Sequence, residues 1–335
     1  MAPGKQLMIQ PDQIEHICIE PTTYCNLHCP QCNRFDREGF LNSELELVHM
    51  DPAILQRNID ITKFTKLQTI RFEGGYGDTL MHPRPFELFD AVGPVNIVVV
   101  TNGSLRSPKW FKQLAERKNV SVIFSIDGLE DTNAYYRINS DWSIIMNNAR
   151  AYIAAGGQAR WKMVIFGHNE HQVETARELS KTMGFVDFET VYSDRSWYTG
   201  KTWPVKVEGK YLYDLKSSSS FTLEYVPNPG KGAVKKIQQN QNPLDIRNQC
   251  HLVKLRKVFI NYRGHVIPCC MNTMLTWSSD IHSKMWRKMI GDLTSIDINY
   301  YPLDQIIQGD FFQKTLPDSL QSERKHGYCI NYCSR

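Results

Sequence analysis

Three cysteines with an unusual spacing raise the question of chemistry in this chain. Cys25, Cys29 and Cys32 lie within eight residues, in the segment TTYCNLHCPQC that follows the first apolar stretch. The next cysteine in the sequence is Cys250. Disulfides use cysteines in pairs, and a structural zinc site usually takes four ligands. Three thiolates in one short loop therefore indicate a metal centre with one ligand position left open.

The composition limits the classes of partner and compartment. The chain has 335 residues, enough for one large and one small domain, and its 39 basic and 35 acidic residues give a net charge of +4. This charge is too small to predict a nucleic-acid partner. No apolar run is long enough for a membrane span, and the N-terminal segment lacks the apolar core of a signal peptide. We therefore expect a cytoplasmic protein, in which clustered cysteines are more often ligands than disulfides.

Six short apolar runs alternate with helical segments along the first part of the chain. The runs contain Cys18, Phe72, Val98, Phe124, Ile165 and Phe188. Asp51 and Ser107, each followed by proline, predict helix starts, and Gly156 and Gly184 predict helix ends. Alternating strands and helices predict an α/β fold with a parallel sheet. Six units are too few for an eight-stranded barrel and predict a partial one, with chemistry at the carboxyl ends of its strands.

The loops after these strands hold the residues that suit ligand binding. We expect them to meet at one edge of the sheet, and they contain Gly74, Gly75, Gly77, Asn102, Ser125, Arg137 and Asn169. The glycines allow a ligand to approach the backbone closely. Three of the polar residues also have a structural interpretation: a turn for Asn102, a salt bridge for Arg137 and a helix cap for Asn169.

Several of these segments together resemble the radical S-adenosylmethionine (radical SAM) enzymes. They are EPTTYCNLHCPQCNR, the glycine-rich second loop, TNG and SIDG, and the branch they most resemble carries a SPASM or twitch domain. The resemblance implies a partial (β/α)6 TIM-like barrel over the first six units. It also implies that Cys25, Cys29 and Cys32 bind a 4Fe–4S cluster whose fourth iron takes S-adenosylmethionine. Cleavage would then give a 5′-deoxyadenosyl radical that abstracts hydrogen from a substrate.

The same resemblance implies a set of cofactor-binding residues. They are Gly75, Gly77, Asp78, Asn102, Ser125, Arg137 and Asn169. The family's second loop commonly reads Gly-x-Gly-Glu-Pro, whereas this chain has Asp78 and Thr79 at the last two positions. Asp78 keeps the carboxylate for the methionyl amino group but has a shorter reach. Zinc held by the three cysteines and His28 is a weaker alternative, because His28 and Cys29 are adjacent and would both have to turn inward.

A second group of cysteines lies in the tail. The segment from Cys250 to Cys270 predicts a β-hairpin with Arg263 and Gly264 in its turn. The spacing of Cys250, Gly264 and Cys269 resembles the start of SPASM and twitch domains. The resemblance implies an auxiliary 4Fe–4S cluster ligated by Cys250, Cys269, Cys329 and Cys333. Whether Cys269 or the adjacent Cys270 is the ligand stays open. Zinc held by the same four thiolates stays open.

The sequence thus predicts three regions and one reaction class. The barrel covers 1–193, a connector or substrate-facing insertion covers 194–248, and the small β-hairpin/α cluster domain covers 249–335. We expect an oxidation or other modification of a small molecule or peptide, with electrons from a donor such as flavodoxin or ferredoxin. The alternative is a zinc-organised binding protein on the barrel scaffold. The substrate and the catalytic acid or base are not predicted.

Overall fold

The computed structural model describes residues 9–193, 202–220, 250–268 and 281–321. These residues fall into two compact units. The first unit contains the described residues of 9–23, 44–97 and 250–321, and the second contains those of 24–43, 98–193 and 202–220. The cysteine loop belongs to the second unit and the glycine-rich loop to the first.

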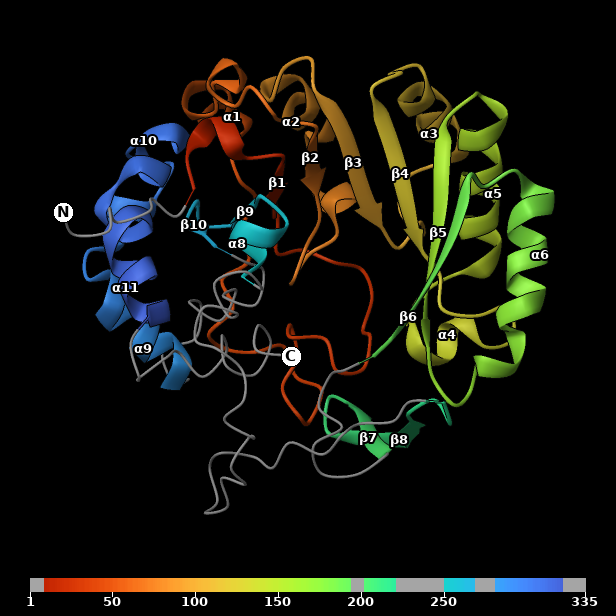
Figure 1. The fold of residues 1–335 in the computed structure, drawn as a ribbon. Coiled ribbons are helices and arrows are strands. Elements are labelled where there is room, and N and C mark those ends of the chain that lie inside the picture. The colour runs from red at the N-terminus through yellow and green to blue at the C-terminus, as the bar shows by residue number, and fades with distance from the viewer. Residues whose placement is uncertain (1–8, 194–201, 221–249, 269–280, 322–335) are drawn as a thin grey trace. The chain divides into compact units, whose positions relative to one another are not determined.

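All six predicted strands are present (Figure 1). They are β1 (His16–Ile19), β2 (Thr69–Phe72), β3 (Asn96–Thr101), β4 (Val120–Ser125), β5 (Gln158–Ile165) and β6 (Asp187–Tyr192). The tail adds β9 (Lys257–Ile260) and β10 (Val266–Ile267), and the strand order is β10-β9-β1-β2-β3-β4-β5-β6. The mostly parallel sheet, with helices between its strands, confirms the predicted α/β class and its partial-barrel type.

The helices begin and end largely where the sequence predicts. They are α1 (Pro52–Asn58), α2 (Pro85–Ala91), α3 (Pro108–Ala115), α4 (Asn133–Tyr136), α5 (Trp142–Ala154), α6 (Val173–Met183), α8 (His251–Lys254), α9 (Ile281–Ile290), α10 (Leu303–Gln308) and α11 (Leu316–Gln321). Asp51 caps α1 by accepting from the backbone of Ala53, and Ser107 caps α3. Gly184 ends α6 in the left-handed conformation that glycine adopts readily. No helix in the described ranges is long and apolar enough to cross a membrane.

In the first unit, β1 lies between β2 and β9 and is parallel to both. The predicted tail hairpin is confirmed in its central part, because β9 pairs antiparallel with β10. Its predicted first residues, His251–Lys254, are instead the helix α8. The turn of the hairpin contains Gly264 at φ +94°, where an added Cβ would lie 2.5 Å from Asn299 Nδ2. The hairpin therefore extends the parallel sheet through β9, which places a segment of the tail beside the first strand of the chain.

In the second unit, β4, β5 and β6 form parallel pairs around a large aromatic core. Trp161 on β5 is fully buried and donates from its indole nitrogen to the carbonyl of Ile126 at 2.9 Å. Part of the predicted connector forms a second sheet, the hairpin of β7 (Thr202–Val207) and β8 (Lys210–Lys216). Val205 and Leu215 of this hairpin are buried against Tyr136 and Phe166.

Candidate cluster-binding loop and its surroundings

The cysteine loop folds into consecutive turns that keep its three thiols out of disulfides. Cys25, Cys29 and Cys32 are free cysteines and partly exposed. The backbone nitrogen of Cys32 donates to the carbonyl of Cys29 at 3.2 Å, and that of Phe35 donates to the carbonyl of Cys32 at 3.0 Å. Gln31 makes the tight turn with φ +61°, an uncommon conformation for a residue with a side chain. The loop thus presents three thiols from a short piece of backbone.

Cys25 lies beside the end of β3, where the predicted residue Asn102 is located. Asn102 Nδ2 lies 3.9 Å from Cys25 Sγ and donates to Asn26 Oδ1 at 2.9 Å. Its Oδ1 accepts from both the backbone nitrogen and the hydroxyl of Ser104, at 2.8 and 2.6 Å. Asn102 therefore forms the turn that its structural interpretation required, and it also directs an N–H toward one of the three sulfurs.

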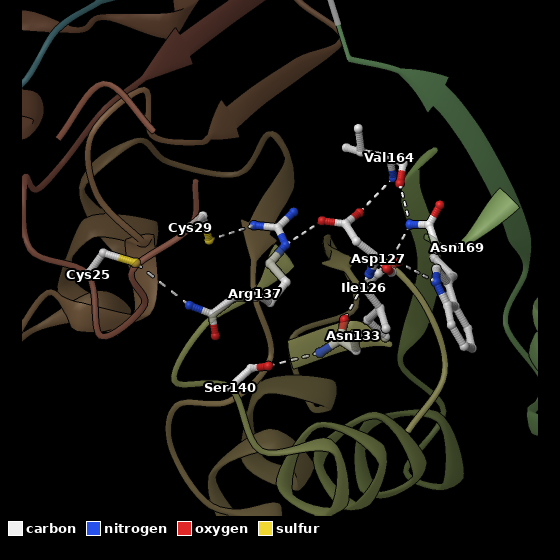
Figure 2. A network of polar contacts seen from close by, with 11 residues as sticks. Cys25, Cys29, Ile126, Asp127, Asn133, Arg137, Ser140, Val164 and Asn169 are labelled. Atoms are coloured by element: carbon white, nitrogen blue, oxygen red, sulfur yellow. Dashed lines mark hydrogen bonds and ion pairs between the residues drawn. The ribbon is translucent and has the colours of Figure 1, made fainter. Parts of the chain in front are cut away.

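Cys29 lies beside the predicted residue Arg137 (Figure 2). Arg137 Nη1 is 3.9 Å from Cys29 Sγ, and Nε is 2.5 Å from Asp127 Oδ2. Asp127 is fully buried, whereas 18% of the Arg137 side chain is exposed. Arg137 thus makes the salt bridge of the structural interpretation and also places a positive charge at the cysteine loop.

Asp127 is a residue whose importance the sequence did not reveal. Its Oδ1 accepts from the backbone nitrogen of Val164 at 2.6 Å, while its own backbone nitrogen donates to Asn133 Oδ1 at 2.9 Å. These bonds fix the carboxylate that orients Arg137 (Figure 2). Its signals in the sequence are its place in the SIDG segment and its position two residues after a buried strand, which also fits an ordinary turn.

The predicted cofactor residue Asn169 is fully buried, and backbone groups occupy its amide (Figure 2). Its Nδ2 donates to the carbonyls of Asp127 and Val164 at 2.8 and 2.9 Å. Its Oδ1 accepts from the backbone nitrogen of Phe166 at 2.7 Å. Asn169 joins the loops after β4 and β5, so these contacts favour its structural interpretation. Ser125, at the end of β4, is partly exposed, and its hydroxyl makes no hydrogen bond within the described residues.

The pKa values of the Cys29–Arg137 pair follow from burial and charge. Burial raises the pKa of the Cys29 thiol to about 11, although the guanidinium of Arg137 opposes this shift. Burial lowers the pKa of Arg137, but the adjacent Asp127 carboxylate outweighs it, so the net shift is upward. Cys29 is therefore a protonated thiol at neutral pH when no metal is bound, and it must lose its proton to become a ligand.

The glycine-rich loop of the first unit is organised by a buried acid, Glu20. Its Oε1 accepts from the backbone nitrogen of Tyr76 at 2.6 Å. A Cβ on Gly74 would lie 2.0 Å from the carbonyl oxygen of Gly77, so only glycine fits there. The predicted residue Asp78 is buried, and it accepts from the backbone nitrogen of Leu80 at 2.9 Å. Its carboxylate thus caps the short 3₁₀ turn Thr79–Met81.

The zinc alternative for the first loop finds no support in the described residues. His28 stacks on Phe35 with ring centroids 3.7 Å apart. Within the described ranges, no three His, Cys, Asp or Glu side chains come together as ligands of one metal ion. The thiolates of a zinc site lie ~4 Å from one another, whereas a 4Fe–4S cluster holds its thiolates at separate corners of a cube.

Of the four predicted tail ligands, the structure describes one. Cys250 is buried directly before α8 and forms no disulfide, and its carbonyl accepts from the backbone nitrogens of Val253 and Lys254. Cys269, Cys329 and Cys333, together with Cys270, lie outside the described residues. The tail site stays a prediction.

Comparisons with known proteins bear on the fold and on the cysteine loop. Residues 19–182 match the model of the Radical SAM superfamily. No curated protein matches the sequence. Among solved structures, the chain is similar to Streptococcus suis SuiB bound to S-adenosylmethionine, with a TM-score of 0.53 and 14% identity over 93% of this chain and 67% of that one. SuiB bound to its precursor peptide SuiA gives a TM-score of 0.53 and 15% identity over 93% and 65%.

A third similar structure is histidine-tagged anSMEcpe with bound AdoMet, another name for S-adenosylmethionine. Its TM-score is 0.56, at 13% identity over 92% of this chain and 81% of that one. At these identities the structural likeness shows the fold alone. The chain spans about two thirds of the length of SuiB. Residues 19–182 are thus similar to the Radical SAM superfamily, and the solved structures share the fold of this chain.

Proposed function

We propose that this chain is a radical SAM enzyme in which Cys25, Cys29 and Cys32 hold a 4Fe–4S cluster with one iron open to S-adenosylmethionine. The observation that carries the proposal is the loop itself: three cysteines outside disulfides on a few residues of backbone, within the residues 19–182 that match the Radical SAM superfamily. The surroundings also fit such a cluster. Hydrogen-bond donors near the sulfurs tune an iron–sulfur centre, and Asn102 and Arg137 direct N–H groups toward Cys25 and Cys29.

When bound, the cluster supplies the electron that cleaves the carbon–sulfur bond of S-adenosylmethionine, giving the radical that removes hydrogen from the substrate. The residues of the chain would hold the cluster and orient the cosubstrate. Asp127 fixes Arg137, whose positive charge favours negative charge on the sulfur of Cys29. The Ser125 hydroxyl is available to the cosubstrate at the end of β4. Asp78 and the backbone of Gly75 and Gly77 are proposed to receive its methionyl amino group.

We further propose that the tail binds an auxiliary 4Fe–4S cluster of the twitch or SPASM type. Its ligands would be Cys250, Cys269, Cys329 and Cys333. The support is the hairpin of β9 and β10 and the buried Cys250, which precedes it and forms no disulfide. A cluster with four protein ligands has no open iron, so it would transfer electrons or support the site and would not activate substrate directly.

The proposed reaction is an oxidation or other modification of a small molecule or a peptide. A peptide is supported by the likeness to SuiB, which was solved with its precursor peptide. The proposed electron donor is a flavodoxin or ferredoxin, and the proposed location is the cytoplasm.

Single replacement of each loop cysteine tests the central proposal. Cys25→Ala, Cys29→Ala and Cys32→Ala should each abolish formation of 5′-deoxyadenosine from S-adenosylmethionine in anaerobic, reduced protein. His28→Phe is the matched control, because it keeps the ring that stacks on Phe35 and removes both ring nitrogens. The control should keep its iron and its cleavage activity. Cleavage by any of the three cysteine variants would refute the proposal, and one zinc per wild-type loop that is lost in His28→Phe would favour the zinc alternative.

A further inference from the structure

The first unit contains a cavity of about 330 Å³ near the carboxyl ends of β1 and β9. Its lining comes from three stretches of that unit: residues between 46 and 54, the β9–β10 turn at 262–264, and Asn299. His49 in the first stretch forms a β-bridge with Thr22, shortly after β1, and Tyr262 closely follows β9. Parallel sheets bind ligands at the carboxyl ends of their strands. The place and the size of the cavity therefore suit a small molecule.

One part of the lining is apolar and packed in place. Val48 and Ile54 are partly buried, and Met50 and Tyr262 are buried. The ring of Tyr262 packs edge to face against that of Tyr76, with ring centroids 5.8 Å apart. This part of the cavity suits the apolar portion of a ligand.

The polar part of the lining places a cation beside an anion. Arg263 Nε lies 3.4 Å from Glu46 Oε2, and 29% of the Arg263 side chain and 58% of the Glu46 side chain are exposed. Arg263 Nε is buried and has no hydrogen-bond partner, and the two terminal nitrogens make no hydrogen bond within the described residues. The carboxylate of Glu46 likewise accepts no hydrogen bond from the described residues. A guanidinium has five N–H donors, so this ion pair keeps unused hydrogen-bonding capacity on both sides.

The other acid and the histidine of the lining have partners of their own. Asp51 caps α1 by accepting from the backbone of Ala53, and its carboxylate lies 3.2 Å from the guanidinium of Arg84. His49 Nδ1 is 2.8 Å from the hydroxyl of Thr22, and burial lowers the pKa of His49, so its ring is neutral at neutral pH. The ion pair therefore offers a ligand one positive and one negative group.

Two neighbouring charges of opposite sign select a ligand that carries both signs. A simple anion would be repelled by Glu46, and a simple cation by Arg263. The terminal nitrogens of an arginine bind a carboxylate through two parallel hydrogen bonds, and a carboxylate accepts hydrogen bonds from an ammonium group. In an α-amino acid the carboxylate and the ammonium group are attached to one carbon atom, which leaves the side chain for the apolar part of the lining.

We propose that this cavity binds a free α-amino acid with an apolar side chain, its carboxylate on Arg263 and its ammonium group on Glu46. The site goes beyond the radical chemistry and does not rest on it, because neither residue is an expected ligand of a cluster or of S-adenosylmethionine.

Three probes that share one side chain test the site. L-phenylalanine carries both charges, L-phenylalaninol carries only the ammonium group, and 3-phenylpropanoate carries only the carboxylate. Binding to anaerobically purified full-length protein would be measured by isothermal titration calorimetry at neutral pH and low ionic strength. We expect L-phenylalanine to bind at least about ten times as tightly as either analogue, because each analogue lacks one set of charge-assisted hydrogen bonds.

Substitutions then assign each charge to its residue. Arg263→Gln should reduce the affinity for L-phenylalanine to that of L-phenylalaninol for wild-type protein. Glu46→Gln should reduce it to that of 3-phenylpropanoate, and this exposed residue can be replaced without disturbing the fold. Arg256→Gln is the matched control, because Arg256 also pairs with a glutamate in the first unit but does not line the cavity. The control should bind L-phenylalanine as tightly as wild-type protein does.

The inference is overturned if L-phenylalanine binds no more tightly than the two analogues, or if Glu46→Gln and Arg263→Gln bind it as wild-type protein does. Equal binding of N-acetyl-L-phenylalaninamide would also overturn it, because the cavity would then take a residue within a peptide chain. Displacement of L-phenylalanine by stoichiometric S-adenosylmethionine would assign the cavity to the cosubstrate and overturn it too. Cofactor cleavage is a separate measurement: absent binding with intact cleavage removes only this site, whereas binding without cleavage removes only the proposed function.

Discussion

Glu20 and Tyr76 are joined by a hydrogen bond of 2.6 Å from the backbone nitrogen of Tyr76 to Oε1 of Glu20. The residue after β1 thereby holds the glycine-rich loop after β2. Glu20 is completely buried, and its Oε2 has no hydrogen-bond partner within the described residues. Burial raises its pKa from 4.5 to about 8, although the backbone N–H groups of Tyr76 and Gly75 oppose this shift.

This raised pKa predicts that stability falls as the pH rises. Between pH 4.5 and about 8 the folded protein keeps the Glu20 proton and the unfolded chain has lost it. The unfolded state is therefore favoured with increasing pH, by about 3–5 kcal/mol over the whole window. Glu20→Gln should remove this contribution, because an amide oxygen still accepts from Tyr76 and does not ionise. Urea unfolding at pH 5 and pH 8 measures the difference.

The exposed strand residue Glu189 provides the control for Glu20. Glu189→Gln should keep the wild-type dependence on pH. A Glu20→Gln protein that loses as much stability as wild type between the two pH values would show that Glu20 is ionised in the folded state.

The ion pair of Arg137 and Asp127 should dominate the stability of the second unit's polar network. Arg137→Gln leaves the fully buried Asp127 carboxylate unpaired, which costs ~3–5 kcal/mol. Adding Asp127→Asn should restore part of the loss, because the buried charge is then gone. Arg256→Gln, which breaks the exposed pair with Glu15, should cost no more than ~1 kcal/mol. Denaturant unfolding of these three variants and of Asp127→Asn alone forms the test, and additive losses for the Arg137 and Asp127 substitutions would contradict the coupling.

Two substitutions of Asp78 separate the effect of its negative charge from the effect of its hydrogen bond to the 3₁₀ turn. Asp78→Asn keeps an oxygen for the backbone nitrogen of Leu80 and removes the negative charge. If the carboxylate holds the methionyl ammonium, Asp78→Asn should weaken S-adenosylmethionine binding by ~1–3 kcal/mol. Asp78→Ala should show the same loss and in addition destabilise the fold by ~1 kcal/mol, because the cap is lost. Unchanged affinity in Asp78→Asn, measured by calorimetry, would assign the ammonium to the backbone of Gly75 and Gly77.

Iron content should separate the two proposed clusters. Anaerobically prepared protein should hold about eight irons, and a variant without Cys25, Cys29 and Cys32 should hold about four. A Cys329→Ala/Cys333→Ala variant should also hold about four, and it should still cleave S-adenosylmethionine slowly without turning over product. Metal analysis decides the outcome. About four irons and one zinc per wild-type chain would exclude the auxiliary cluster and leave the first loop unaffected.

The sequence predicts this fold well where one physical signal is sufficient. Buried strands need apolar, β-branched residues, so all six runs of the first part are strands. The site is predicted less completely, because the role of a polar residue depends on partners distant in sequence. Asn169 was expected to bind cofactor, yet its amide is occupied by the backbones of three residues. The sequence does not assign a role to Asp127, because its partner, Arg137, is identified only by the fold.

The pairing of β9 with β1 has a consequence for how the chain acquires its structure. β1 ends at Ile19, and its neighbour on that side begins only at Lys257. Contacts between segments so distant in sequence form slowly, because a long loop must close before they contribute. On the ribosome, β1 therefore remains an open edge strand until most of the chain has been made, and such edges pair readily with other chains. Nascent chains that stop before residue 257 should depend on chaperones far more than the complete protein does.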